Sequence, residues 1–330
     1  SSVTVTGSSN IITDNGDYGY YIYTFGNGSI TTTLTDEVIT GHGTGIHVED
    51  FGDPSTSYYD VDIQDSNLSG NTIYGVNNEV EGLTVMATPN WWGSACGPAS
   101  INGDVIYSPW YIDAAMTTTT TGEIGAYVFS TGASTETMNA IIACAAPGST
   151  LTFESGSYPG DLVVGADKTD LTFELNGSTV GPGSSAFTIN GDDITINGPG
   201  VLDGSGSSDP GILVNDYADN FILYGVYIEG WADGVSVNGS HHASFKMVNN
   251  WLHDNTGAGL FTASDLSFAE GSVVTIEGNL FKENDGDGVE NASTTTNLPA
   301  DYNSWGDIGG PTTGDGVSGL VTSTPFTYSE

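Results

Sequence analysis

Residues 250–260 read NWLHDNTGAGL, residues 279–289 read NLFKENDGDGV, and residues 10–20 read NIITDNGDYGY. The three stretches align without gaps as Asn, two apolar residues, two polar residues, Asn, three variable residues, Gly and an apolar or aromatic residue. Helical periodicity is almost absent, and short runs alternate apolar and polar residues as half-buried strands do. Weaker copies of the pattern, spaced so that successive glycines lie 23 to 30 residues apart, end at Gly45, Gly75, Gly211 and Gly234.

A repeat of this length without a helix predicts a coil of short strands. Each coil would lay its strands beside those of the next, about 4.8 Å away, so that equivalent side chains stack in columns. We expect the repeated Gly at a corner that needs a positive φ. The alternative is an antiparallel sandwich whose turns are spaced alike by coincidence. In the coil, four repeated asparagines would bond their own backbone and their stacked neighbours at a corner: Asn15, Asn71, Asn255 and Asn284.

Two neighbouring segments have the character of an end cap and an opening coil. Residues 135–146 are predicted to form a short helix, with Ser134 as N-cap and Glu136 in the first turn. Residues 145–153 (AAPGSTLTF) and 156–160 (GSYPG) follow it. Together they resemble the capping helix and first coil of the right-handed parallel β-helix, or pectate-lyase-like, superfamily. The resemblance implies an all-β fold, a right-handed parallel β-helix solenoid with one short helix over the apolar end of its core.

A closing motif occurs twice in the chain. NWWG at 90–93 is followed by Gly-Pro at 97–98, and NSWG at 303–306 is followed by Gly-Pro at 310–311. Such endings are similar to those of many secreted multi-coil surface proteins, in which Trp91, Trp92 and Trp305 would pack at the ends. The duplication predicts two tandem units: a first solenoid at 1–115, a Thr-rich linker at 116–122, and a second, capped solenoid at 123–330.

The first predicted unit has coils and an ending but no cap, because residues 1–6 (SSVTVT) already have the pattern of a strand. An uncapped coil presents unpaired backbone groups to water. Either the chain was cut from a longer tandem protein, or another copy covers this edge. In the second case the strand-like tail, residues 317–328, would be the donor, in a head-to-tail contact that does not close. Otherwise this tail packs on its own unit.

The composition excludes nucleic acid as a partner, and the lengths of the apolar runs exclude a membrane-spanning segment. Lys and Arg total 3 against 41 Asp and Glu, and the net charge is −38. Nucleic-acid binding is excluded because it needs clustered cations. No apolar run approaches the roughly 18–20 residues that span a bilayer, so no transmembrane segment is predicted.

Several features predict a secreted or cell-surface location. Cys96 and Cys144 are the only cysteines, too few for a soft-ligand metal site, and favour one disulfide in an oxidising compartment. The scarcity of Lys and Arg also removes the cleavage sites of trypsin-like proteases. Five sequons are candidate glycosylation sites: Asn27, Asn67, Asn176, Asn238 and Asn291.

The superfamily that the chain resembles also includes enzymes that cut polysaccharides. Those similar to pectate lyases hold substrate through calcium and use a basic side chain, commonly Arg, whereas this chain has no Arg. Gly41-His42-Gly43 matches a short polygalacturonase-like motif, but the accompanying paired-Asp and Arg-Ile-Lys motifs are missing. The sequence therefore does not predict an enzyme, and it leaves one catalytic alternative open.

That alternative is an acidic column. Counting back five residues from the repeated Gly brings Glu229, Asp254 and Glu283 onto consecutive coils, with His253 and Lys282 beside them. Carboxylates on neighbouring coils would lie about 5 Å apart. Such a column is a solvated acidic stripe, a site for a hard cation, or the acid and nucleophile of a glycoside hydrolase.

Two further candidates concern calcium and sugars. Residues 284–288 (NDGDG) resemble a calcium loop, with Asp285 and Asp287 as ligands, although the corner of the repeat explains the glycines equally. Trp231 and Trp251 would either stack on sugars or pack internally.

From these observations we expect an extracellular structural protein, a subunit of a fibre, surface layer or adhesin that binds copies of itself head to tail. The alternatives are a secreted glycoside hydrolase using the acidic column and a calcium-dependent carbohydrate-binding module.

Overall fold

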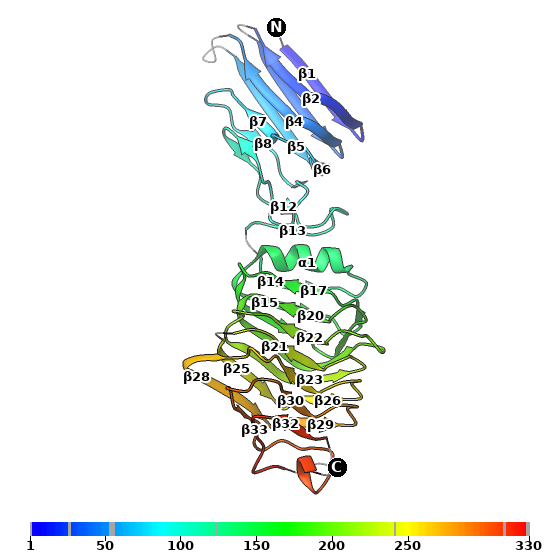
Figure 1. Cartoon of the computed structure of the whole chain (residues 1–330). Coiled ribbons are helices and arrows are strands. Elements are labelled where there is room, and N and C mark those ends of the chain that lie inside the picture. The colour runs from blue at the N-terminus through cyan, green and yellow to red at the C-terminus, as the bar shows by residue number, and fades with distance from the viewer. Residues whose placement is uncertain are drawn as a thin grey trace. The chain divides into compact units, whose positions relative to one another are not determined.

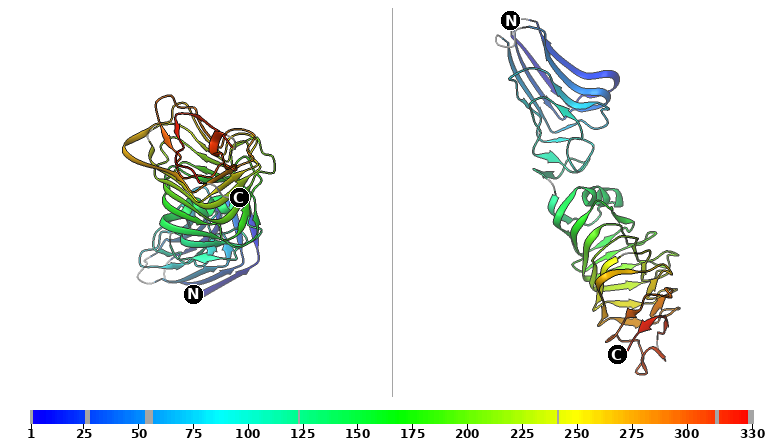
Figure 2. Two further views of the ribbon diagram at one scale, coloured as in Figure 1. Left: turned by 90° about the horizontal axis from the view of Figure 1, so that it is seen from below. Right: turned by 60° about the vertical axis from the view of Figure 1, so that its left-hand side comes forward.

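The computed structural model describes residues 2–25, 28–52, 57–122, 124–240, 242–312 and 315–327. It is all-β, with 52% strand and 4% helix, and forms a parallel β-solenoid of about 12 turns, as predicted. The chain divides into two compact units, unit 1 (Ser1–Glu123) and unit 2 (Ile124–Glu330). In each unit the strands lie side by side as successive rungs (Figures 1 and 2).

Unit 1 consists of two parallel sheets and a short antiparallel pair. The first sheet contains, in spatial order, β1 (Ser2–Ser8), β3 (Ser29–Thr35), β5 (Tyr58–Gln64), β8 (Val85–Met86) and β11 (Val105–Ile106). The second contains β2 (Ile11–Thr24), β4 (Val38–Asp50), β6 (Ser66–Asn67), β7 (Tyr74–Asn78), β9 (Asn90–Trp91) and β10 (Ile101–Asn102). The antiparallel pair is β12 (Trp110–Tyr111) and β13 (Thr119–Thr120). Thr119–Thr120 of the predicted linker is therefore a strand of unit 1.

Unit 2 has three parallel sheets, one helix and one 3₁₀ turn. The largest sheet contains β14 (Ile124–Phe129), β15 (Ala145–Phe153), β16 (Ser157–Tyr158), β18 (Thr169–Glu174), β19 (Ser178–Val180), β21 (Asp192–Asp203), β23 (Phe221–Glu229), β25 (His242–Val248), β26 (Trp251–His253), β28 (Phe268–Glu277) and β29 (Leu280–Lys282). The second contains β17 (Leu162–Val164), β20 (Phe187–Ile189), β22 (Ile212–Val214), β24 (Val235–Val237), β27 (Leu260–Thr262), β30 (Val289–Asn291) and β32 (Val317–Gly319). The third pairs β31 (Leu298–Pro299) with β33 (Val321–Thr322), and the remaining elements are α1 (Thr135–Cys144) and η1 (Gly310–Thr312).

The register confirms the repeat that the sequence predicts. In the second sheet of unit 2, Ile212 pairs with Val235, Val235 with Leu260, and Leu260 with Val289. All four side chains are fully buried. They form one of the apolar columns of the core, and stacking of equivalent residues therefore builds the interior coil by coil.

The helix prediction is also confirmed, two residues shorter than expected. The Ser134 side chain accepts a hydrogen bond from the Thr137 N–H and caps the helix, which ends at Cys144. Met138, Ile141 and Ile142 are fully buried against the first coil of unit 2. Figure 1 shows α1 lying across the end of the stacked strands β14 and β17.

The repeated glycines do not have the positive φ that we expected. What they lack is room for a side chain: a Cβ on Gly259 would lie 2.6 Å from the Phe281 ring, and one on Gly288 would lie 3.0 Å from the Trp305 ring. The left-handed corner falls one turn earlier, at Asp254 (φ 54°) and Glu283 (φ 60°). In most copies the carbonyl oxygen of the next repeated Gly also lies 2.6–2.8 Å from that Cβ position, as at Gly45, Gly234 and Gly259. The physical reason for the repeated Gly is therefore crowding by the next coil, to which aromatic rings contribute in some copies.

The corner asparagines behave as predicted in most copies. Asn255 Nδ2 donates to Asn284 Oδ1 at 2.9 Å, and Asn284 Nδ2 donates in turn to Asp315 Oδ2. Asn71 Nδ2 donates to the carbonyls of Ile39 and Leu68. Asn15 differs, because its side chain is exposed. The ladder therefore satisfies backbone and amide groups along the stack of coils.

The closing motifs have the same conformation in both units. Gly93 and Gly306 both have positive φ, and the preceding Trp92 and Trp305 are buried in their own units. The tail after the second motif is part of unit 2, since β32 extends the sheet beyond β30 and β33 pairs with β31. Tyr328, at the end of the predicted donor segment, lies outside the described residues.

Candidate functional site

The predicted acidic column is wrong by one position. The strand register sets Glu229 opposite His253, and His253 opposite Lys282. Asp254 and Glu283 follow their strands at the left-handed corner, with exposed side chains. The turn after that corner explains the error. Gly230 occupies the left-handed corner after Glu229, and the repeated Gly follows it by four positions, whereas it follows Asp254 and Glu283 by five. The three carboxylates thus belong to two neighbouring columns, and only Glu229 and Asp254 converge.

The carboxylates of Glu229 and Asp254 converge on the imidazole of His253. His253 Nδ1 lies 2.7 Å from Asp254 Oδ2, and His253 Nε2 lies 3.3 Å from Glu229 Oε2. The His253 side chain is 15% exposed and packs against the Trp251 ring, with ring centres 4.8 Å apart. Ligand atoms of Glu229, His253 and Asp254 lie within 4.8 Å of one another, a separation that one metal ion bridges. We call these three residues the His253 cluster.

Unit 1 holds a second cluster of the same residue types. His47, Glu49 and Glu79 also bring ligand atoms within 4.8 Å of one another. Asn77 Nδ2 lies 2.9 Å from His47 Nδ1 and donates to Glu79 Oε1 at 2.9 Å, while His47 Nε2 lies 3.4 Å from Glu49 Oε2. We call His47, Glu49 and Glu79 the His47 cluster. The His47 cluster was not predicted from the sequence, although His47 and Asn77 occupy the same repeat position in consecutive coils.

An exposed aromatic surface lies beside the His47 cluster. Neighbouring rings of this surface are in contact. The centres of the Tyr21 and Tyr23 rings lie 5.0 Å apart, and the Phe25 and Phe51 rings stack with their centres 5.0 Å apart. The Tyr21 hydroxyl donates to Glu49 Oε2 at 2.5 Å, a hydrogen bond that raises the pKa of Tyr21 to about 12. The run YGYYIYTF at 18–25 was a signal for this surface that the sequence analysis did not use. The members of this aromatic strip are each at least 40% exposed: Tyr18, Tyr21, Tyr23, Phe25 and Phe51.

His42, the histidine of the Gly-His-Gly match, has a structural role. Its ring accepts a hydrogen bond at Nδ1 from the Asn15 N–H, and its Nε2 lies 3.1 Å from the Ile12 carbonyl. Asn71 makes the same two contacts one coil later, accepting from the His42 N–H and donating to the Ile39 carbonyl. His42 is 1% exposed and therefore takes the place of an asparagine in the corner ladder.

The other predicted site residues are dispersed. Among the described residues, Asp285 and Asp287 join no group of three ligand side chains, and calcium binding there stays a prediction. Trp231 is fully buried and donates from Nε1 to the Leu202 carbonyl, so it cannot stack on a sugar with Trp251. Neither Cys96 nor Cys144 is a free thiol, and the pairing between them stays a prediction.

One glycosylation site is contradicted by the structure. Asn291 is 3% exposed, and its Nδ2 donates to the carbonyls of Thr296 and Leu320, which leaves no room for a glycan. Asn176 is exposed, while Asn67 and Asn238 are half-buried. Asn27 lies outside the described residues.

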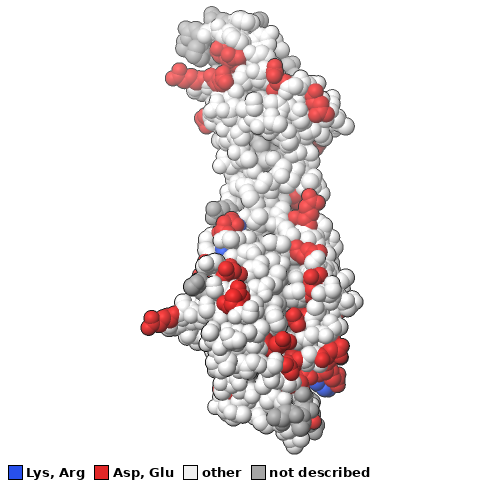
Figure 3. Space-filling view, viewed as in Figure 1, with Lys and Arg blue, Asp and Glu red and all other residues white. Residues whose placement is uncertain are grey.

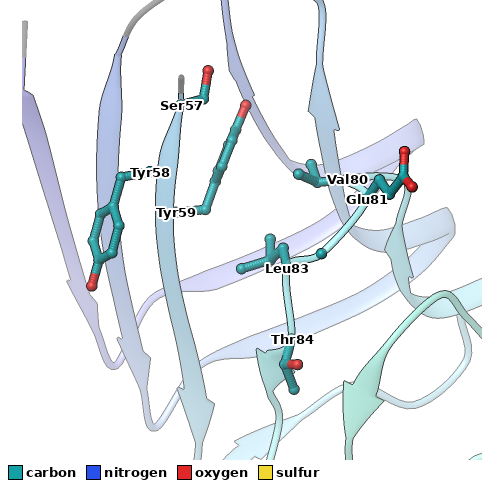
Figure 4. Close-up of a pocket in the computed structure, with 8 residues that line it drawn as sticks. Ser57, Tyr58, Tyr59, Val80, Glu81, Leu83 and Thr84 are labelled. Carbon is teal, nitrogen blue, oxygen red and sulfur yellow. The ribbon is translucent and has the colours of Figure 1, made fainter. Parts of the chain in front are cut away.

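A hollow in unit 1 is shallow and has few functional groups. It has a volume of about 280 Å³ and lies between residues 57–59 and 80–84. Figure 4 shows Tyr59 and Leu83 facing the hollow, while Tyr58 points away. Among the described residues that line it, Glu81 contributes the one carboxylate, so no pair of convergent carboxylates is present there. A more open hollow of about 640 Å³ lies beside β28 in unit 2, lined by Ser, Thr, Asn and apolar residues.

Acidic side chains form scattered patches on the face of both units that Figure 3 shows, with few blue atoms among them. Lys282 is paired with Glu283, Nζ to Oε1, at 3.5 Å, and Lys168 with Asp167 at 3.2 Å. The surface therefore attracts cations and repels anionic polymers.

In comparisons with known proteins, no family model, curated protein or solved structure matches the chain. In the described part of the chain, no helix is both long and apolar enough to cross a membrane.

Proposed function

We propose that the protein is an extracellular structural protein of the pectate-lyase-like β-helix type, and that its copies stack end to end in a fibre, surface layer or adhesin. The observation that carries this proposal is the free edge of the first coil in unit 1. Among the described residues, β1 pairs with β3 on one side and with no strand on the other. A free edge of this kind is a template for another strand.

The free edge lacks the usual protection. Val3, Val5 and Ile11 are 53%, 40% and 76% exposed, and residues 2–8 contain no charge in a chain of net charge −38. Natural edge strands are commonly protected by Lys, Pro or a bulge. The apolar and uncharged character of β1 therefore favours strand pairing over contact with water.

A second copy is the favoured occupant because the last coil of unit 2 offers a matching edge. β32 and β33 are the outermost strands of their sheets, and residues 316–327 carry no charge. Leu320 and Phe326 are 42% and 38% exposed at this end. Since the tail is already paired within unit 2, we propose stacking of coil on coil rather than donation of the tail.

The test is the molar mass of the full chain, measured by light scattering over a range of protein concentrations, with electron microscopy of the same samples. We expect assemblies that grow with concentration, and more strongly when salt screens the repulsion between acidic copies. The double variant Val3→Asp/Val5→Asp puts charge on the edge and should remain monomeric.

A matched control carries the same two charges away from both ends. Val163 is 44% exposed on β17, which contacts α1, and Tyr224 is 48% exposed on β23, which is paired on both sides, so Val163→Asp/Tyr224→Asp should assemble like the unmodified chain. Monomers at every concentration, or assembly that survives the β1 substitutions, would contradict the proposal.

A second candidate function is carbohydrate binding, and the aromatic strip favours it. Exposed Tyr and Phe rings give flat apolar faces for sugar rings, and the Tyr21 and Glu49 oxygens beside them offer hydrogen bonds. The acidic surface disfavours anionic glycans. Titration of neutral oligosaccharides should give binding that Tyr23→Ala/Phe51→Ala abolishes and Tyr224→Ala, on exposed β23, leaves unchanged. Equal binding by both variants would exclude this surface.

A further inference from the structure

The contacts in the two histidine clusters favour opposite tautomers of their imidazoles. In the His47 cluster, the Asn77 amide nitrogen faces Glu79, which can only accept, so the orientation of that amide is fixed. The Asn102 amide donates to Asn77 Oδ1, which requires the same orientation of the Asn77 amide. Asn77 therefore donates to His47 Nδ1 as well. The proton of the neutral His47 ring must then lie on Nε2, pointing toward Glu49.

In the His253 cluster the arrangement is reversed. The Asp254 carboxylate lies 2.7 Å from His253 Nδ1 and can only accept, so Nδ1 carries the proton. The lone pair of the neutral ring is then on Nε2. The atom that faces it, Glu229 Oε2 at 3.3 Å, is also an acceptor. Two acceptors at this distance repel each other unless a positive charge lies between them, and either a second proton on the ring or a metal ion at Nε2 supplies that charge.

We propose that the His253 cluster is a binding site for zinc or another divalent transition metal, with His253 Nε2 and Glu229 Oε2 as its ligands. Zn–N and Zn–O bonds of about 2.0–2.2 Å at a tetrahedral angle put two ligand atoms about 3.3–3.5 Å apart. The observed 3.3 Å fits that separation without movement of either side chain. Imidazole is a ligand that such ions prefer and calcium does not, and zinc also accepts a carboxylate oxygen.

Asp254 is the positioning residue of this site. A carboxylate that accepts from the other ring nitrogen fixes the tautomer and orientation of a histidine ligand. The Trp251 ring holds the imidazole from the side, and Tyr227 packs on Trp251 with ring centres 5.1 Å apart. Lys282, the next residue of the column, is paired with Glu283 and does not neutralise Glu229. Water would fill the remaining coordination positions, because Glu229 is 38% exposed.

The experiment is titration of the metal-free full chain with Zn²⁺ by calorimetry, repeated with Co²⁺ by visible absorption to report the ligand field. We expect binding that Ca²⁺ does not reproduce. His253→Gln and Glu229→Gln should each weaken Zn²⁺ binding at least 10-fold, and Asp254→Ala roughly 10- to 100-fold. The matched control His47→Gln should bind Zn²⁺ like the unmodified chain.

Glu229→Gln separates the metal site from simple loss of structure. Its amide can donate to the Nε2 lone pair, so the variant should lose Zn²⁺ binding while its metal-free melting temperature stays equal or rises. Asp254→Asn still accepts from Nδ1 and tolerates the left-handed corner, so it should bind more tightly than Asp254→Ala.

A second measurement does not depend on any metal. Long-range ¹⁵N–¹H spectra of the imidazoles, assigned with the His253→Gln and His47→Gln variants, should show the proton on Nδ1 of His253 and on Nε2 of His47. A His253 ring protonated at Nε2, Zn²⁺ binding that persists unchanged in His253→Gln, or no Zn²⁺ binding at all would each overturn the inference.

Discussion

The first coils of the two units end in different ways. In unit 2 the end of the core is covered by α1, whose Met138, Ile141 and Ile142 are fully buried. In unit 1 the first strand, β1, has Val3 and Val5 53% and 40% exposed and a free backbone edge among the described residues. The coils themselves are built alike, with parallel register and the same corner ladder.

The two units therefore differ in how the first coil is covered and not in how the coils are built. A parallel coil satisfies its backbone only through its neighbours, so each end must be covered by a helix, by a further coil or by water. Unit 2 uses the first solution within its own sequence. Unit 1 leaves the edge available, and the proposed stacking of copies follows from that difference.

The largest expected effect comes from charging the covered end. Ile142→Asp buries a carboxylate in the apolar contact between α1 and the first coil, and should lower the free energy of unfolding of unit 2 by more than about 4 kcal/mol. Val5→Asp in β1 should cost unit 1 less than about 1 kcal/mol, since its side chain is already 40% exposed. Hydrogen exchange followed by mass spectrometry reports each unit separately. Equal losses of protection in the two variants would remove the distinction between the ends.

The closing motifs should respond more alike. Trp305 is fully buried and stacks on Phe281 with ring centres 5.1 Å apart, so Trp305→Ala should destabilise unit 2 by about 3–5 kcal/mol. Trp92 is 8% exposed, and Trp92→Ala should cost unit 1 somewhat less. Trp91→Ala, beside it on the half-buried side, is the control and should cost about 1 kcal/mol. A larger loss in Trp91→Ala than in Trp92→Ala would mean that the motif packs differently.

Most of the fold was predictable because one repeat carries it. The Asn and Gly positions recur at the register that the strands adopt, and Ser134 caps the helix where expected. The role of the repeated Gly was not predictable, because the ring that excludes a side chain at Gly259 belongs to Phe281, in the next coil. Spacing along a chain does not show which residue of another coil fills a given space.

The candidate site was predictable only in part, for a related reason. Glu229, His253 and Asp254 were identified, but Asp254 was assigned to the column of Glu229 instead of the corner beside it. The repeated Gly follows the left-handed residue by four positions after Gly230 but by five after Asp254, so counting back from the Gly shifts the register by one. The tautomers of His47 and His253 depend on amide and carboxylate contacts between coils, which only coordinates provide.

Smaller effects distinguish the two units by pH. Burial raises the pKa of Asp315 above its ordinary 3.8, although hydrogen bonds from Asn284 act in the opposite direction. Burial, followed by the Asp60 charge, raises the pKa of Asp62 in unit 1. A raised folded-state pKa means that the ionised group destabilises the fold above that pKa, and that the cost disappears as pH falls to the unfolded-state value.

Asp315→Asn should therefore stabilise unit 2 at neutral pH by about 1 kcal/mol or less, with no gain below about pH 3.5. Its amide oxygen still accepts from Asn284 and continues the ladder of Asn255 and Asn284. Asp62→Asn should give unit 1 a gain of the same sign. Thermal melts at pH 7.5 and pH 3.5, read by hydrogen exchange in each unit, provide the comparison. A gain for Asp315→Asn that grows as pH falls has the wrong sign and would refute this account.

The smallest expected effect concerns the left-handed corner, where Gly and acidic residues both occur: Asp14, Gly41 and Gly70 in unit 1, and Gly230, Asp254 and Glu283 in unit 2. The glycines accept a positive φ without steric cost, whereas a side chain in that region costs about 1 kcal/mol. Glu283→Gly should therefore stabilise unit 2 by about 0.5–1 kcal/mol after allowance for its weak exposed pair with Lys282.

The reverse substitution measures the same conformational cost of a side chain at positive φ, this time in unit 1. A Cβ on Gly70 would meet nothing closer than the Gly41 nitrogen at 3.9 Å, so Gly70→Ala changes the conformational cost without a clash. It should destabilise unit 1 by about as much as Glu283→Gly stabilises unit 2. Chemical denaturation of the two variants measures both. If Glu283→Gly destabilises while Gly70→Ala behaves as expected, the Glu283 side chain makes a contribution at this corner that exceeds its backbone strain, and the corners of the two units are not equivalent.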